Sequence, residues 1–180
     1  MSQFEFIFVL ASIVVGLALA RLFDGLSQVL QKRRQDFDHV HLAFTVAVIV
    51  FLILVWWTMY RFENKEAWNY AEFVLVVVYM SSLYALAAIL YPRHRAEIPN
   101  FSEIRVAVYM AIVWFFLVDG LNMFVRGDLF SPWYYLPTTS HLVLLAATGI
   151  AVQRRGFDAF YGWWFALVGI AWSFVVRFSV

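Results

Sequence analysis

Long apolar stretches alternate with short polar connections along almost the whole chain. Six apolar stretches are present, at residues 4–31, 39–60, 72–91, 103–125, 138–153 and 158–176. A helix needs about 20 mainly apolar residues to cross the hydrocarbon core of a bilayer. The fifth stretch is the shortest, at 16 residues, and either crosses fully or re-enters. The pattern predicts an all-α integral membrane bundle of six transmembrane helices, with residues 1–180 as a single transmembrane domain.

Residues that commonly start or stop helices stand at the edges of these stretches. A carboxylate, amide or hydroxyl side chain can accept a hydrogen bond from a free N–H group of the first helical turn, whereas proline cannot continue a helix. The predicted helix starts are Asp38, Asn100 with Glu103 in a capping box, and Ser140 after Pro137; the predicted stop is Pro92.

Composition supports a lipid environment. Hydrophobic residues make up 64% of the chain and charged residues 14%, against about 25% charged residues in soluble domains. This excludes an ordinary water-soluble domain and makes the lipid bilayer the expected partner. The net charge is +1, so no basic field favours nucleic acid. The chain has no cysteine, which excludes disulfides, thiolate nucleophiles and cysteine-ligated metals.

Basic residues are distributed unequally between alternate connections. The first, third and fifth connections hold Lys32, Arg33, Arg34, Arg93, Arg95, Arg105, Arg154 and Arg155, whereas the other side holds Arg61, Lys65, Arg126 and Arg177. Lys and Arg accumulate on the cytoplasmic side of a membrane. The distribution therefore predicts that both termini face outward.

The first stretch combines a row of small residues with a polar end. Ser12, Gly16 and Ala20 recur at intervals of four, a spacing that lets another helix approach closely, so we expect helix packing there. Arg21 and Asp24 follow, three residues apart and close enough to pair across one helical turn. Two interpretations stay open for them: a structural ion pair near the inner boundary, and a gate or ion site.

The fourth stretch carries an acid deep within it. Asp119 lies about 20 Å along the helix from Val106, and Asn122 and Arg126 follow on the same side. Such a polar face must turn toward the bundle or toward water. Arg61, Arg126 and Arg177 are candidate partners for the carboxylate. A structural ion pair and a transport site both fit this pattern.

Two short strings suggest an internal repeat. LFDGLS contains Asp24 and LVDGLN contains Asp119, 95 residues later, and each half then has a His-Leu pair, at His41 and His141. Halves of three spans each would have opposite orientations, as in the inverted repeats of secondary transporters. An inverted 3+3 repeat is therefore an alternative prediction.

No catalytic motif stands out, so we expect no enzyme. HExxH, GxSxG and phosphate-binding glycine loops are absent. His41 and His141 fall at opposite ends of the predicted topology, whereas two haem ligands need one depth. His39 and His41 do not share a helical face, which argues against a metal site. No cofactor is predicted.

The opening FEFIFVLASIVVGLALARLFDGL, with a basic connection directly after it, resembles a family of short polytopic bacterial inner-membrane proteins of unassigned function. The resemblance is best over the first helix and implies a multi-pass location in the bacterial inner membrane, but no activity. RLFDG is also similar to an arginine and FSD signature of a small potassium-channel family. In that family the apolar helix follows the signature, whereas here it precedes it, so this similarity is set aside.

Three functions remain as hypotheses. The first is passage of an ion or small solute along a path lined by Asp119, Asn122, Arg21 and Asp24, which predicts a water-accessible cavity reaching Asp119. The second is a membrane-embedded assembly or scaffold subunit, which predicts Asp119 enclosed by a cation. The third is a cofactor-carrying electron-transfer subunit. A homo-oligomer or a membrane-protein partner is expected, because a bundle of this size with a row of small residues leaves lipid-facing surfaces suited to further helix contacts.

Overall fold

The computed structural model describes residues 2–31, 38–63, 65, 67–93 and 98–177. Six α-helices account for most of them: α1 (Gln3–Gln31), α2 (His39–Thr58), α3 (Tyr70–Leu90), α4 (Phe101–Arg126), α5 (Tyr135–Val152) and α6 (Arg155–Arg177). A short 3-10 helix, η2 (Met59–Phe62), extends α2. The predicted all-α architecture with six helices is confirmed, and each helix begins within three residues of the predicted position.

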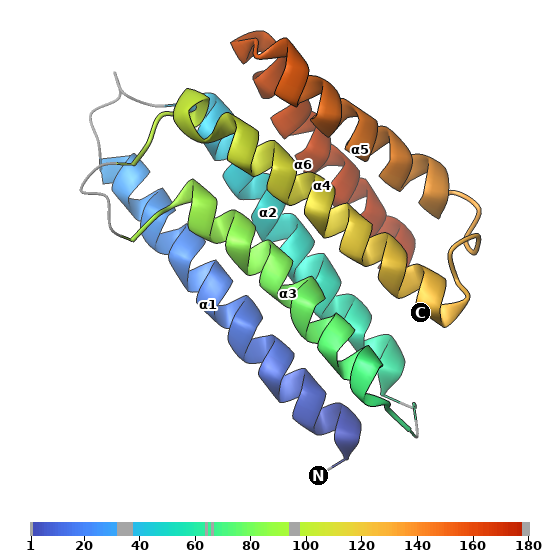
Figure 1. Ribbon diagram of the computed structural model, residues 1–180. Coiled ribbons are helices and arrows are strands. Elements are labelled where there is room, and N and C mark those ends of the chain that lie inside the picture. Colours follow the sequence, from blue (N-terminus) through green and yellow to red (C-terminus); the bar gives the residue numbers. More distant parts are fainter. Residues whose placement is uncertain (1, 32–37, 64, 66, 94–97, 178–180) are drawn as a thin grey trace.

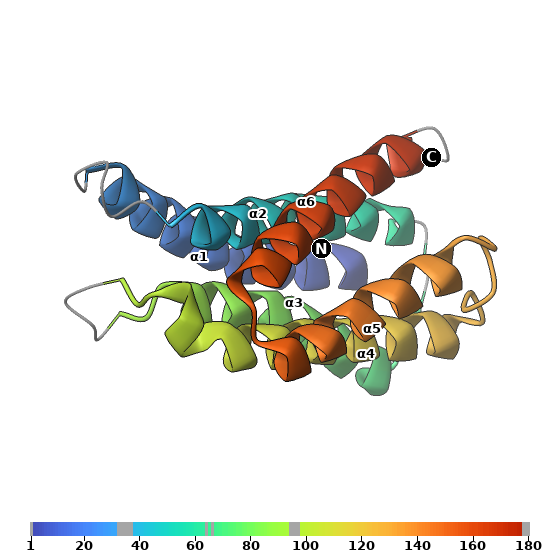
Figure 2. The same ribbon diagram turned by 90° about the horizontal axis from the view of Figure 1, so that it is seen from above.

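Successive helices run in opposite directions (Figure 1). The starts of α1, α3 and α5 and the ends of α2, α4 and α6 therefore lie together, and we call this the terminal end because α1 begins and α6 ends there. The other end is called the opposite end. Seen from above, α1, α2 and α6 form one layer and α3, α4 and α5 form a second (Figure 2). The most extensive helix contact joins α2 to α6, followed by α3 with α4 and α1 with α3.

Five helices are long and apolar enough to cross a membrane: the spans are Gln3–Val29, His39–Phe62, Tyr70–Leu90, Phe101–Arg126 and Tyr135–Val152. Many large apolar side chains on these helices point outward, among them Phe6, Ile13, Leu17, Met110, Leu117 and Leu144. Contact of such an apolar surface with water is unfavourable, whereas contact with lipid acyl chains is favourable. The structure and composition fit a multi-pass membrane protein in a lipid bilayer. The sixth helix has 23 residues and carries Asp158 in its first turn.

Aromatic rings fill the space between the two layers. The ring centroid of Phe51 of α2 lies 4.5 Å from that of Phe165, and 5.9 and 6.0 Å from those of Phe115 and Phe116. Rings at these separations contribute specific contacts beyond simple burial. The middle of the bundle is therefore closed by packed aromatic side chains.

The helix starts follow the sequence signals in part. Asp38 caps α2 by accepting a hydrogen bond from the N–H of Val40 at 3.0 Å, as predicted. Asn100 stands at the N-cap of α4, but its side chain makes no capping hydrogen bond. The prediction that Ser140 starts the fifth helix is wrong, because α5 begins at Tyr135. Pro137 fits in its first turn, where no intrahelical N–H partner is needed.

The three small residues predicted to form a packing row on α1 differ in their surroundings. The Ser12 hydroxyl accepts a hydrogen bond from Trp56 Nε1 of α2 at 3.0 Å. Gly16 has nothing within 4 Å of the place its Cβ would occupy, and Ala20 is exposed. Close packing at Gly16 and Ala20 against another molecule stays a prediction.

Candidate functional site

The fourth helix carries polar residues at both of its ends and apolar residues between them, all on one side. Arg105 and Tyr109 lie near the opposite end, and Asp119, Asn122 and Arg126 lie near the terminal end. Intervals of three, four and seven residues keep side chains on one helical side. The middle of this side is occupied by Ile112, Phe115 and Phe116, which are buried. The polar side of α4 is thus divided into two separate clusters.

The terminal-end cluster faces a cavity of about 540 Å³. Residues of α2, η2, α3, α4, α5 and α6 all contribute to its wall, and it lies where the two layers separate. The polar and charged lining residues are Thr58, Arg61, Tyr79, Asp119, Asn122, Arg126, Asp128, Ser131, Tyr134, Tyr135 and Thr139. A cavity with so many hydrogen-bonding groups is large and polar enough to hold several waters or a small solute.

Asp119 receives its closest hydrogen bond from a tyrosine rather than from an arginine. The Tyr135 hydroxyl of α5 donates to Asp119 Oδ2 at 2.7 Å, and Tyr79 of α3 also lines the cavity beside the carboxylate. The expected cations Arg61 and Arg126 line the same cavity. The side chain of the third candidate, Arg177, lies outside the described part of the chain. The carboxylate is therefore held by a hydroxyl donor and faces a cavity that also holds positive charge.

Arg126 and Asn122 complete the polar wall. The Arg126 guanidinium lies over the ring of Phe62, 4.1 Å from its centroid, an arrangement in which a cation is attracted to the face of the ring. Asn122 is only 5% exposed and lines the cavity. The structure thus brings together the predicted residues Asp119, Asn122 and Arg126.

The cavity ends on the aromatic layer in the middle of the bundle. Phe51, Phe115 and Phe116 form part of its lining, and Phe51 packs directly on Phe165 beyond them. The buried side chains of Tyr109 and Ile112 follow on α4. This conformation separates the cavity from the polar cluster at the opposite end.

That second cluster was missed by sequence reasoning. Arg105 donates to Asp158 Oδ2 from Nε at 2.8 Å and from Nη2 at 2.6 Å, and the Tyr109 hydroxyl donates to Oδ1 at 3.0 Å. Asp158 is 0% exposed. In the sequence, Arg105 contributed only to the predicted orientation of the chain in the membrane. The available signal was one acid near the start of the sixth apolar stretch, where it follows Arg154 and Arg155 and precedes a long apolar and aromatic run.

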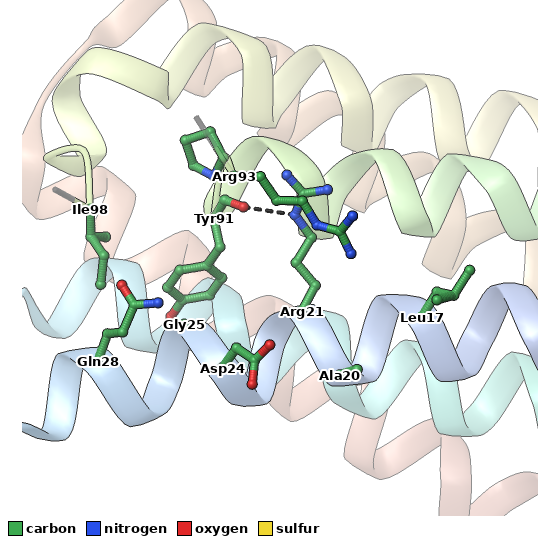
Figure 3. Close-up of a pocket in the computed structure, with 10 residues that line it drawn as sticks. Leu17, Ala20, Arg21, Asp24, Gly25, Gln28, Tyr91, Arg93 and Ile98 are labelled. Carbon is green, nitrogen blue, oxygen red and sulfur yellow. Dashed lines mark hydrogen bonds between the residues drawn. The ribbon is translucent and has the colours of Figure 1, made fainter. Parts of the chain in front are cut away.

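Arg21 and Asp24 do not form the predicted pair. Arg21 Nε donates to the carbonyl oxygen of Tyr91 at 2.7 Å, and its Nη1 donates to the Tyr84 hydroxyl at 3.2 Å, so the guanidinium bridges α1 and α3. Figure 3 shows no hydrogen bond from Arg21 to Asp24, whose side chain is exposed. Both residues lie at the opposite end of the bundle from Asp119. The path lined by Asp119, Asn122, Arg21 and Asp24 therefore stays a prediction, with Asp119 and Asn122 at one end of the bundle and Arg21 and Asp24 at the other.

The described histidines do not form a shared site. His41 is buried beside Tyr91, with ring centroids 4.9 Å apart, whereas His141 accepts a hydrogen bond from Trp164 Nε1 at 2.9 Å on the outside of the bundle. His39 is exposed, and His94 lies outside the described residues. Among the described residues, no group of three or more His, Asp or Glu side chains is placed to hold a metal ion.

No protein-family model, no curated protein and no solved structure matches the chain.

Proposed function

We propose that the protein passes a small polar solute or an ion across the membrane, with the cavity around Asp119 as the site that receives it. The observation that carries this proposal is that a cavity of about 540 Å³ reaches a carboxylate within a membrane-spanning helix. Ionisable groups inside membrane proteins usually face the bundle interior or water and mark substrate or ion pathways. The cavity provides such an environment for Asp119.

The proposed topology has six spans, with α6 as the sixth and the terminal end facing outward. The described basic residues at the opposite end, Arg93, Arg105, Arg154 and Arg155, fit a cytoplasmic location. The cavity then opens on the outer side. The inverted 3+3 repeat, the homo-oligomer and the bacterial inner membrane remain predictions of the same scheme.

A closed floor supports passage by alternating access rather than through a permanently open pore. The aromatic layer around Phe51 and the bonded cluster around Asp158 lie between the cavity and the opposite end. A solute that enters the cavity would therefore remain in it until the two layers separate at the opposite end. In this scheme Arg105, Tyr109 and Asp158 hold the opposite end shut.

The scaffold hypothesis makes a different demand on Asp119. It requires the carboxylate to be enclosed by a cation with no cavity beside it. The hydrogen bond from Tyr135 and the adjoining cavity favour passage instead.

Flux into reconstituted vesicles tests the proposal. Vesicles with the purified full chain are loaded with dyes for protons, potassium, sodium and chloride, and their swelling is followed in gradients of small neutral and zwitterionic solutes. We expect flux above that of protein-free vesicles for at least one of these probes. Asp119→Asn should lower this flux at least tenfold, because the cavity loses its carboxylate charge.

Glu63→Gln is the matched control, since Glu63 is an exposed acid of the same end that does not line the cavity. Unchanged flux for Glu63→Gln together with the loss for Asp119→Asn would support the proposal. No flux for any probe, or equal flux for the parent chain and Asp119→Asn, would overturn it.

A further inference from the structure

A second pocket lies at the opposite end of the bundle, between α1 and the end of α3. It has a volume of about 220 Å³, and its ionic and polar lining side chains are Arg21, Asp24, Gln28, Tyr91 and Arg93 (Figure 3). Arg21 is fixed in place by the Tyr91 carbonyl and the Tyr84 hydroxyl. Arg93 comes from the segment that follows α3 and is exposed. Two guanidinium groups therefore line the pocket: that of Arg21, which is held by hydrogen bonds, and that of Arg93, which is exposed.

The charges in this pocket favour an anion. Arg21 and Arg93 contribute two positive charges and Asp24 one negative charge, which leaves one positive charge. Figure 3 places the two guanidinium groups on the same side of the pocket. An anion in the pocket would be attracted to both groups. Guanidinium groups bind phosphate oxygens through strong charge-assisted hydrogen bonds.

The depth of the pocket matches the headgroup region of a bilayer. Arg21 is 18 residues beyond Gln3, the start of α1, or about 27 Å along the helix, close to the hydrocarbon thickness of about 30 Å. On the membrane side of the pocket, Leu17 is 50% exposed and Ile13 continues the apolar surface. A bound molecule can therefore place a charged group at the arginines and an apolar chain along α1.

We propose that this pocket binds the phosphodiester headgroup of an anionic phospholipid. Basic pockets between transmembrane helices on the cytoplasmic side are suited to such headgroups. The phosphate would lie between Arg21 and Arg93, and the acyl chain would follow Leu17. Free phosphate shares this chemistry, but Asp24 disfavours its second negative charge, so the singly charged phosphodiester is the better match. This inference is independent of the solute cavity at the terminal end.

Lipid binding to the purified full chain tests the proposal. Phosphatidylglycerol, phosphatidylcholine and inorganic phosphate are each titrated into the detergent-solubilised protein, and bound lipid is counted by native mass spectrometry while thermal unfolding is followed in parallel. Phosphatidylglycerol should bind and raise the unfolding temperature. Arg93→Gln should weaken its binding about tenfold, since one charge-assisted contact is lost.

Arg154→Gln is the matched control, because Arg154 is an exposed arginine of the same end that does not line the pocket. Arg93 is used rather than Arg21, since Arg21 also joins α1 to α3 and its loss affects folding. Selective weakening by Arg93→Gln, with Arg154→Gln unchanged, would support the site. Equal weakening by both variants, equal binding of phosphatidylcholine, or equal stabilisation by inorganic phosphate would each overturn the proposed ligand.

Discussion

Two carboxylates inside the bundle are stabilised in different ways. Asp158 accepts hydrogen bonds from Arg105 and Tyr109 and is closed off from solvent. Asp119 accepts one from Tyr135 and faces a cavity. A buried charge is stable only when it is paired and hydrogen-bonded, and removing one member of the pair leaves the other as an uncompensated buried charge. Asp158 is therefore the acid expected to matter most for stability, and Asp119 the one expected to matter most for function.

Removing one member of the Asp158 cluster should destabilise the protein strongly. Asp158→Leu leaves Arg105 without its carboxylate and should lower the free energy of unfolding by about 3–5 kcal/mol. Thermal unfolding of the detergent-solubilised variant measures this change. Replacing all three groups, by Arg105→Met, Tyr109→Phe and Asp158→Leu together, should recover most of the loss. An Asp158→Leu variant as stable as the parent chain would show that the pair of Arg105 and Asp158 contributes little to the free energy of unfolding.

Some residue-level features could be predicted from the sequence and others could not. Asp119, Asn122 and Arg126 lie on one side of a single helix, so helical periodicity was sufficient to group them. Arg21 and Asp24 are also close along a helix, but Arg21 instead finds a carbonyl and a hydroxyl on α3. Asp158 and Arg105 are 53 residues apart in the chain. Such a pairing depends on the arrangement of helices, which spacing does not reveal.

Helix positions followed from hydrophobic length, whereas helix neighbours did not. The apolar stretches indicated six helices because four of them have the length of a span and the other two, at 28 and 16 residues, are near it. Asp38 was recognised as the cap of α2, but it also accepts a hydrogen bond from the Phe101 N–H at 3.4 Å and from Arg155 Nη2 at 3.3 Å. One carboxylate thereby joins the starts of α2, α4 and α6. That junction required the tertiary structure.

Glycine positions distinguish tightly packed helix faces from open ones. A Cβ atom on Gly149 of α5 would overlap the Tyr109 ring, whereas Gly120 of α4 has nothing within 4 Å. We expect Gly149→Ala to lower the free energy of unfolding by about 1–3 kcal/mol through overpacking. Gly120→Ala should be neutral or stabilising by up to about 1 kcal/mol, because alanine favours helix. Thermal unfolding of both variants measures this contrast, and an equal effect of the two would contradict the described α4 and α5 contact.

The bonds between the two helix layers differ at the two ends of the molecule. At the opposite end, Arg21, Asp38 and Asp158 each receive or make a polar contact that crosses from one layer to the other. At the terminal end the crossing contacts include the hydrogen bond from the Trp68 N–H to Gln3 Oε1 at 3.1 Å and ring contacts such as Tyr135 with Trp172. The cavity around Asp119, which is larger than the pocket at the opposite end, lies between the layers. This asymmetry belongs to the whole molecule, and no local sequence pattern predicts it. It is the structural basis for expecting the opposite end to be held closed while the terminal end admits solute.

Accessibility of single cysteines tests this asymmetry directly. The chain has no cysteine, so Asn122→Cys and Ile112→Cys each introduce one thiol on the same side of α4. Asn122 lines the cavity, whereas Ile112 is buried beneath the aromatic floor. A membrane-impermeant maleimide applied to intact cells should label Asn122→Cys and leave Ile112→Cys unlabelled. Arg154→Cys should react only after the membrane is permeabilised, because Arg154 lies at the opposite end. Labelling of Arg154→Cys in intact cells would reverse the proposed orientation, and labelling of Ile112→Cys to the same extent as Asn122→Cys would show that the aromatic floor is open.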